Sequence, residues 1–106
     1  MAYDFYFTPR AEQDLDDILS YISFDLKNET AARNLGNKIF EQIDNVCLFP
    51  LSGSLVVNEL LVDNSIRKLI IDNYVLYYIS NEQEKRIYIL RVVYGQRNLD
   101  NVFRNI

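Results

Sequence analysis

Residues 66–94, IRKLIIDNYVLYYISNEQEKRIYILRVVY, are the part of the sequence that decides the fold. They contain three runs rich in aromatic and β-branched residues, which are typical of β-strands. The three runs are residues 66–71, 74–79 and 86–94. Between them, Asp72-Asn73 predicts a two-residue hairpin turn, and residues 80–85 predict a longer polar turn. The stretch therefore predicts a meander of antiparallel strands.

The last run, residues 86–94, is the longest strand candidate, and it predicts two distinct faces. Because successive side chains of a strand point to opposite sides, alternate residues share a face. One face would carry Tyr88, Leu90, Val92 and Tyr94, and the other Ile87, Ile89, Arg91 and Val93. Gly95 ends the strand, and the polar residues 96–106 predict a short C-terminal helix or an ordered tail.

Upstream of these strands, two helices are expected. Thr8 can cap a helix, and Pro9 suits the first helical position because its missing N–H would have no intrahelical partner there. Two apolar stripes at helical spacing follow. They consist of Leu15, Ile18, Leu19, Ile22 and Leu26, and of Ala32, Leu35, Ile39, Ile43 and Val46. The polar link at 27–30 is short and Phe49-Pro50 ends the second stripe, so the helices should form an antiparallel hairpin.

The first of these helices begins with acidic side chains. Glu12, Asp14, Asp16 and Asp17 lie in its early turns. Carboxylates in that position interact favourably with the positive end of the helix dipole. We therefore expect these residues to form a solvated helix start rather than a metal site.

The order of elements predicts an α+β fold. Tyr3 to Phe7 alternate in the manner of a half-buried strand, whereas residues 51–65 are compatible with a short strand, a helical turn or a loop. A strand, a helix hairpin and a meander of three or four strands imply that the hairpin packs on one sheet face. We expect a single domain over residues 1–106, in which the first strand pairs with a later one in either orientation.

Composition excludes several kinds of chemistry. The chain has 106 residues, no His and one Cys, and its net charge is −4. Without His there is no imidazole acid–base pair and no His-containing zinc site, and a lone Cys47 forms no internal disulfide. The start MAYDFYFTPR lacks the features of a signal peptide, and no run approaches the roughly 20 apolar residues of a membrane span. We expect a cytoplasmic protein without metal or cofactor, with Cys47 in the core or at its edge.

The charge is unevenly distributed along the chain. Residues 1–53 carry −5, whereas residues 66–97 carry six basic and three acidic side chains. The acid therefore belongs to the predicted helices and the basic residues to the predicted sheet. A basic sheet face could meet an anionic partner in spite of the negative total.

Several strings, taken together in this order, resemble the RelE/ParE superfamily of bacterial toxins. They are TPRAEQDLDDILSYI at 8–22, FPLSG at 49–53, IRKLIIDNYVLYYI at 66–79 and RIYILRVVYGQRNL at 86–99. The resemblance implies a RelE/ParE-like fold and the toxin of a type II toxin–antitoxin system of the plasmid-stabilisation kind. It also implies a cognate antitoxin that neutralises the toxin and generally represses their shared operon. The helix hairpin and the basic sheet edge would contact that antitoxin.

The superfamily holds two main activities: RelE-like members cut mRNA on the ribosome, and ParE-like members inhibit DNA gyrase. For a nuclease the resemblance points to Arg67, Lys68, Arg97 and Tyr94 as catalytic candidates. Two expected groups are missing, however, because Val75 replaces an Arg and Phe103 replaces a C-terminal Tyr. A phenol of ordinary pKa, such as that of Tyr94, is also a poor base at neutral pH.

A ParE-like toxin that binds and inhibits gyrase is therefore the preferred interpretation. A RelE-like, ribosome-dependent mRNA endoribonuclease is the alternative, and a degenerate, non-toxic antitoxin-binding module is a third. No direct DNA binding is expected without the antitoxin, and no membrane partner. The candidates for target binding are Arg67, Lys68, Arg91, Tyr94 and Arg97.

Overall fold

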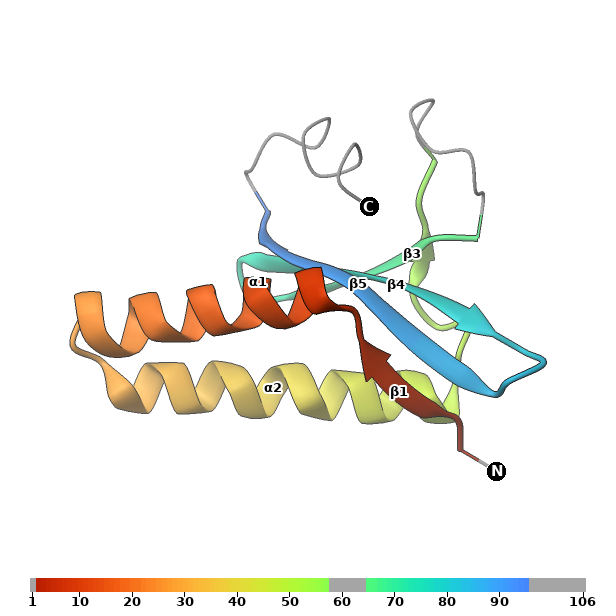
Figure 1. Ribbon diagram of the computed structural model, residues 1–106, viewed down its shortest axis with the longest axis horizontal. Helices are drawn as coiled ribbons and strands as arrows, with labels where there is room; N and C mark the ends of the chain where they lie inside the picture. Colours follow the sequence, from red (N-terminus) through yellow and green to blue (C-terminus); the bar gives the residue numbers. More distant parts are fainter. Residues whose placement is uncertain (1, 58–64, 96–106) are drawn as a thin grey trace.

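The structure is a computed structural model that describes residues 2–57 and 65–95, and in it two helices cover one face of a five-stranded sheet (Figure 1). The strands are β1 (Asp4–Phe7), β2 (Ser54–Leu55), β3 (Arg67–Ile71), β4 (Tyr74–Asn81) and β5 (Arg86–Tyr94). The helices are α1 (Pro9–Ser20), the π-helical turn η1 (Tyr21–Asp25) and α2 (Glu29–Leu48). The predicted α+β class and element order are confirmed, while the predicted C-terminal helix or tail lies outside the described residues.

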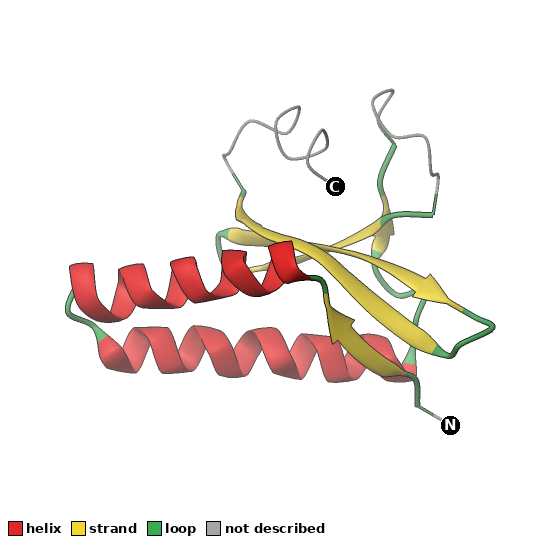
Figure 2. Cartoon of the chain, viewed as in Figure 1, coloured by secondary structure: helices red, strands yellow, loops and turns green. Residues whose placement is uncertain are grey.

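The sheet, whose strands are yellow in Figure 2, has the order β1-β5-β4-β3-β2, and the pairs β2–β3, β3–β4 and β4–β5 are antiparallel. The N-terminal strand, whose orientation the sequence left open, runs parallel to β5 with Asp4 opposite Arg86. The carboxylate of Asp4 accepts hydrogen bonds of 3.0 and 3.1 Å from the Arg86 guanidinium. This contact lowers the pKa of Asp4, so the first strand is held to the last by charge as well as by backbone pairing.

Side chains cap the starts of both α1 and α2, and the cap at Thr8 was predicted from the sequence. Thr8 Oγ1 accepts a hydrogen bond of 3.2 Å from the backbone N–H of Ala11, and Pro9 occupies the first turn. The same hydroxyl donates to the carbonyl of Leu90 on β5, at 3.2 Å. Asn28 caps α2 in the same way, through a 3.0 Å bond from Ala31 N–H. Thr8 therefore sets both the start of α1 and its position beside the sheet.

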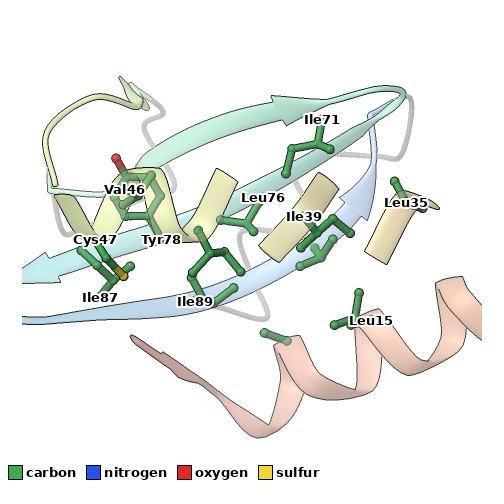
Figure 3. Close-up of a cluster of buried hydrophobic side chains, with 13 residues drawn as sticks. Leu15, Leu35, Ile39, Val46, Cys47, Ile71, Leu76, Tyr78, Ile87 and Ile89 are labelled. Atoms are coloured by element: carbon green, nitrogen blue, oxygen red, sulfur yellow. The ribbon is translucent and has the colours of Figure 1, made fainter. Parts of the chain in front are cut away.

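The main core lies between the helices and the sheet, and Figure 3 shows its buried side chains. It is built from the predicted helical stripes and from alternate strand residues. Its buried members include Leu15, Leu35, Ile39, Ile43, Val46, Cys47, Ile71, Leu76, Tyr78, Ile87, Ile89 and Val92. The prediction that Cys47 is a core residue is confirmed. A smaller cluster of Ile66, Tyr77 and Val93 lies apart from this core.

The predicted alternation of β5 is wrong beyond Ile89, because the strand contains a β-bulge. Its pairing with β4 steps from Tyr78↔Ile89 to Tyr77↔Arg91, which leaves Leu90 as an extra residue. As a result Val92, rather than Val93, joins Ile87 and Ile89 in the main core. A single inserted residue thus exchanges the two faces for the rest of the strand.

The bulge lies next to a buried ion pair that corrects the expectation of a solvated Asp14. Asp14 is 7% exposed and Arg91 is 1% exposed. Arg91 donates to the Asp14 carboxylate from Nε at 2.7 Å and from Nη2 at 3.1 Å. The backbone N–H of Val92 donates to the same carboxylate at 3.1 Å.

The position of β1 explains why a carboxylate belongs there. Among the described residues, the last backbone link on the β1 side of β5 is from Thr8 N–H to the carbonyl of Ile89, so this edge of β5 has no strand partner beyond that point. The helix α1 continues along the same edge, and Asp14 accepts the N–H that a neighbouring strand would otherwise take. The buried carboxylate thus replaces a strand at the edge of β5.

Replacing Asp14 by Ala should destabilise the protein by about 3–5 kcal/mol, because it leaves the guanidinium of Arg91 buried without its main counter-charge. Urea denaturation followed by circular dichroism measures the loss. The matched control is Asp16→Ala on the exposed side of the same helix, which should stay within about 0.5 kcal/mol of the parent. A loss below about 1 kcal/mol for the Asp14 variant would contradict this account.

Candidate functional site

Of the five residues predicted to contact a target, the four that the structure describes do not form one surface. Lys68 and Tyr94 both line a cavity of about 340 Å³ beside the β3–β4 turn. Arg67 is bound to a loop, Arg91 is buried, and Arg97 lies outside the described residues. Among the four described members of the predicted set, Lys68 and Tyr94 are the two that line one cavity.

Arg67 holds the loop that follows α2. Its Nη1 donates to the carbonyl of Gly53 at 2.8 Å and to the carbonyl of Leu51 at 3.2 Å. The adjacent Tyr78 hydroxyl donates to the carbonyl of Pro50 at 3.0 Å and accepts from Gly53 N–H at 2.9 Å. Two side chains of neighbouring strands thus satisfy four backbone groups of one loop.

Gly53 is required by the close approach of this loop to the sheet. A Cβ at this position would lie 2.6 Å from the Tyr78 hydroxyl and 2.8 Å from the backbone carbonyl of Lys68. Because the second contact is with backbone, a larger residue would displace the loop from β3. The glycine of the string FPLSG is therefore explained by the close packing of this loop on the sheet, and Arg67 by its hydrogen bonds to the loop.

Arg91, one of the predicted target-binding residues, is buried. Its guanidinium lies against Asp14, and its side chain is 1% exposed. Arg86 is paired with Asp4 on the first strand. Three basic residues of the sheet, Arg67, Arg86 and Arg91, are thus bound to other groups of the described chain, whereas Lys68 lies beside the cavity.

The cavity that contains Lys68 and Tyr94 is the part of the predicted site that remains open to a partner. Tyr94 is 46% exposed, and its ring packs edge-on against Tyr74 with 5.7 Å between centroids. Burial is the main cause that raises the pKa of Tyr74, and the neighbouring Tyr94 and Tyr21 raise it further. Its phenol is therefore unsuited to act as a base at neutral pH, whereas Lys68 offers a cation. This arrangement suits binding rather than proton transfer.

Asp14 and Tyr78 are the residues that the sequence interpretation missed or placed differently. Asp14 lies three residues after Ala11 and four before Ile18, so it occupies a position of the buried helical stripe. A carboxylate at an apolar-stripe position indicates a buried partner, and this signal was available. The sequence offers no such signal for Tyr78, because its partners lie 25 and 28 residues away in an irregular loop.

Metal and membrane chemistry receive no support from the described part of the chain. Within residues 2–57 and 65–95, no group of three His, Cys, Asp or Glu side chains could hold a metal ion. None of the described helices is long and apolar enough to cross a membrane.

Burial, together with nearby Asp44 and Asp4, raises the pKa of the Cys47 thiol.

The chain belongs to the ParE toxin family. Residues 5–99 match the family described as ParE toxin of the type II toxin–antitoxin system, parDE. No curated protein matches the chain significantly.

Two solved structures share the fold. The chromosomal ParDE toxin–antitoxin system from P. aeruginosa has a TM-score of 0.70 and 21% identity, over 90% of this chain and 98% of that chain. The toxin–antitoxin complex RelBE2 from Mycobacterium tuberculosis has a TM-score of 0.55 and 18% identity, over 89% of this chain and 99% of that one. At these identities the likeness establishes the common fold.

Replacing Tyr78 by Phe should cost about 1–3 kcal/mol of unfolding free energy, because it leaves Gly53 N–H buried without its acceptor. Thermal and urea denaturation test this value. Tyr88→Phe is the matched control, since the Tyr88 hydroxyl donates to Glu84 at an exposed site. Equal losses in the two variants would show that the loop contact of Tyr78 stabilises the fold no more than the exposed contact of Tyr88.

Cys47 should react slowly with a thiol reagent in the folded protein. Its side chain is buried and its raised pKa lowers the fraction of thiolate, which is the reactive form. Reaction with Ellman's reagent at pH 8, compared with the same reaction in denaturant, measures the difference. As the chain has one Cys, the absorbance reports this thiol alone, and equal rates would contradict its burial.

Proposed function

We propose that this protein is a growth-inhibiting toxin that binds and inhibits DNA gyrase and is neutralised by a cognate antitoxin. The observation that carries the proposal is the match of residues 5–99 to the ParE toxin family. The proposed place of action is the cytoplasm, where gyrase and the antitoxin are found.

The state of the basic residues favours gyrase inhibition over RNA cleavage. A nuclease needs free cationic groups on the phosphate and groups that give and take a proton. In the described residues Arg67 is hydrogen-bonded to loop carbonyls and Arg91 is paired with Asp14. The chain has no His, and Val75 stands where the resemblance to the nucleases calls for Arg. Arg97 stays a candidate from the resemblance alone.

Lys68 and Tyr94 are the residues we propose for target contact. Both line the cavity beside the β3–β4 turn, together with the exposed Ile70 and the turn residues Asp72 and Asn73. A cation beside apolar and aromatic surface is a common composition for the centre of a protein interface. Asp72 is ion-paired with Lys38 at 3.1 Å, so contact with a target would depend on Lys68, Ile70 and Tyr94.

The helix hairpin is the surface we propose for the antitoxin. A groove of about 440 Å³ runs between the two helices and includes Leu19, Phe24, Gly36 and Phe40. Phe24 is 74% exposed and Phe40 42%, and because both line this groove they form an exposed apolar patch of the kind that marks protein interaction sites. An amphipathic helix of a partner protein fits such a groove.

Induced expression in a bacterial host should arrest growth, and co-expression of the neighbouring antitoxin gene should restore it. Unimpaired growth with soluble protein would leave only the non-toxic antitoxin-binding module. Purified protein should inhibit gyrase in a supercoiling assay. Discrete new mRNA 5′ ends within codons, with gyrase unaffected, would instead establish the RelE-like nuclease.

Replacing Lys68 by Ala should weaken gyrase inhibition by about fivefold or more, the usual effect of truncating an important interface residue. The concentration that gives half-maximal inhibition of supercoiling measures the change. Arg33→Ala, which removes an exposed cation from α2 in the helical layer, is the control and should inhibit like the parent. Equal inhibition by both variants would remove Lys68 from the target surface.

A further inference from the structure

Three tyrosines and one carboxylate surround a second cavity, between α1, η1 and the ends of β4 and β5. Its volume is about 430 Å³, and its lining residues are Asp17, Ile18, Tyr21, Tyr74 and Tyr94. In Figure 1 the turn between β3 and β4 and the end of β5 lie beside α1. The cavity thus joins residues from distant parts of the chain, and the sequence pattern did not connect them.

The aromatic side chains of this cavity lie close together and are open at the rim. The rings of Tyr74 and Tyr94 are inclined at 68° to each other, so they present an edge and a face rather than two parallel faces. Tyr21 is 53% exposed and Tyr94 is 46% exposed, whereas Tyr74 is partly buried. The ring of Tyr74 can form the floor of the site, and the rings of Tyr21 and Tyr94 its walls.

The electrostatic character of the cavity is negative. The faces of aromatic rings carry partial negative charge, and Asp17 adds a full one. One Asp17 oxygen accepts a 2.8 Å hydrogen bond from the side-chain amide of Gln13, which orients the carboxylate. Among the described residues that line the cavity there is no Lys or Arg. The helical half of the chain, residues 1–53, also carries −5, so its field attracts cations.

We propose that this cavity binds the guanidinium group of an arginine presented by a partner protein. Cations are attracted to the faces of aromatic rings, and a planar guanidinium also stacks on them. Its forked N–H groups match the geometry of a carboxylate such as Asp17. Lysine provides a point charge without stacking, and a quaternary ammonium has no N–H to donate to Asp17.

The proposal rests on the proposed function in one respect, namely that this chain has a protein partner. Recognition itself follows from Asp17 and the three rings. It does not depend on gyrase being the target, and it is tested without measuring toxicity. Tyr94 lines both this cavity and the one that contains Lys68, so an arginine bound here would lie next to the proposed target surface.

The test is a titration of the purified full chain, with its tyrosine rings ¹³C-labelled, followed by NMR. The probe is Nα-acetyl-arginine amide, with the citrulline analogue as the neutral isostere and the lysine analogue and choline as competing cations. Saturable shifts of Tyr21, Tyr74 and Tyr94 are expected at roughly millimolar arginine amide, since exposed cation–π and ion-pair contacts are weak. Affinity should fall from arginine to lysine to choline, and citrulline should cause no saturable shift.

Variants locate the binding within the cavity. Asp17→Asn and Tyr94→Leu should each weaken arginine binding by about two- to fivefold. The controls are Asp25→Asn and Tyr6→Leu, which change an exposed carboxylate and an exposed tyrosine elsewhere. If Tyr94→Leu does not fold, Tyr21→Leu on the rim of the cavity takes its place.

Several results would overturn the proposal. They are binding of citrulline as strong as that of arginine, tighter binding of choline than of arginine, absence of saturable shifts, and unchanged affinity in both site variants. Absence of arginine binding by the parent protein, with growth inhibition intact, would remove this proposal alone. Conversely, arginine binding by a chain that neither arrests growth nor binds an antitoxin would remove the proposed function and leave the site.

Discussion

The buried ion pair between Asp14 and Arg91 ties the helical layer to the sheet where β1 ends. Three hydrogen bonds reach one carboxylate, two from the guanidinium and one from Val92 N–H. The pair places α1 along the open edge of β5, beside the β-bulge at Leu90. Because removing one member would take from the other, which is buried, its closest counter-charge, the position of α1 on the sheet depends on both.

This constraint also determines which residues are left for a partner. Arg91 is occupied by Asp14, and Arg67 by the carbonyls of Leu51 and Gly53. The basic residues of the sheet therefore largely hold the molecule together. The exposed chemistry is concentrated at the start of β4 and the end of β5, where Tyr94 borders two cavities, and in the groove between the helices.

Most of the fold could be predicted because its signals are local. Thr8-Pro9 and Asn28 start helices through neighbouring groups, Asp72-Asn73 forms a tight turn, and the apolar stripes follow helical spacing. The site was less predictable. The bulge at Leu90 arises from the pairing of two strands, and it reverses the face of every later residue in β5. No local sequence pattern predicts such an extra residue.

By itself, the sequence determined the order of elements, the α+β class and the absence of histidine chemistry, since these follow from composition and short-range periodicity. The tertiary structure alone decided that Arg91 lies inside, that Arg67 binds a loop, and that Tyr21, Tyr74 and Tyr94 gather around Asp17. These contacts join residues tens of positions apart. Their geometry depends on strand register and on the docking of α1, which exist only once the layers have packed.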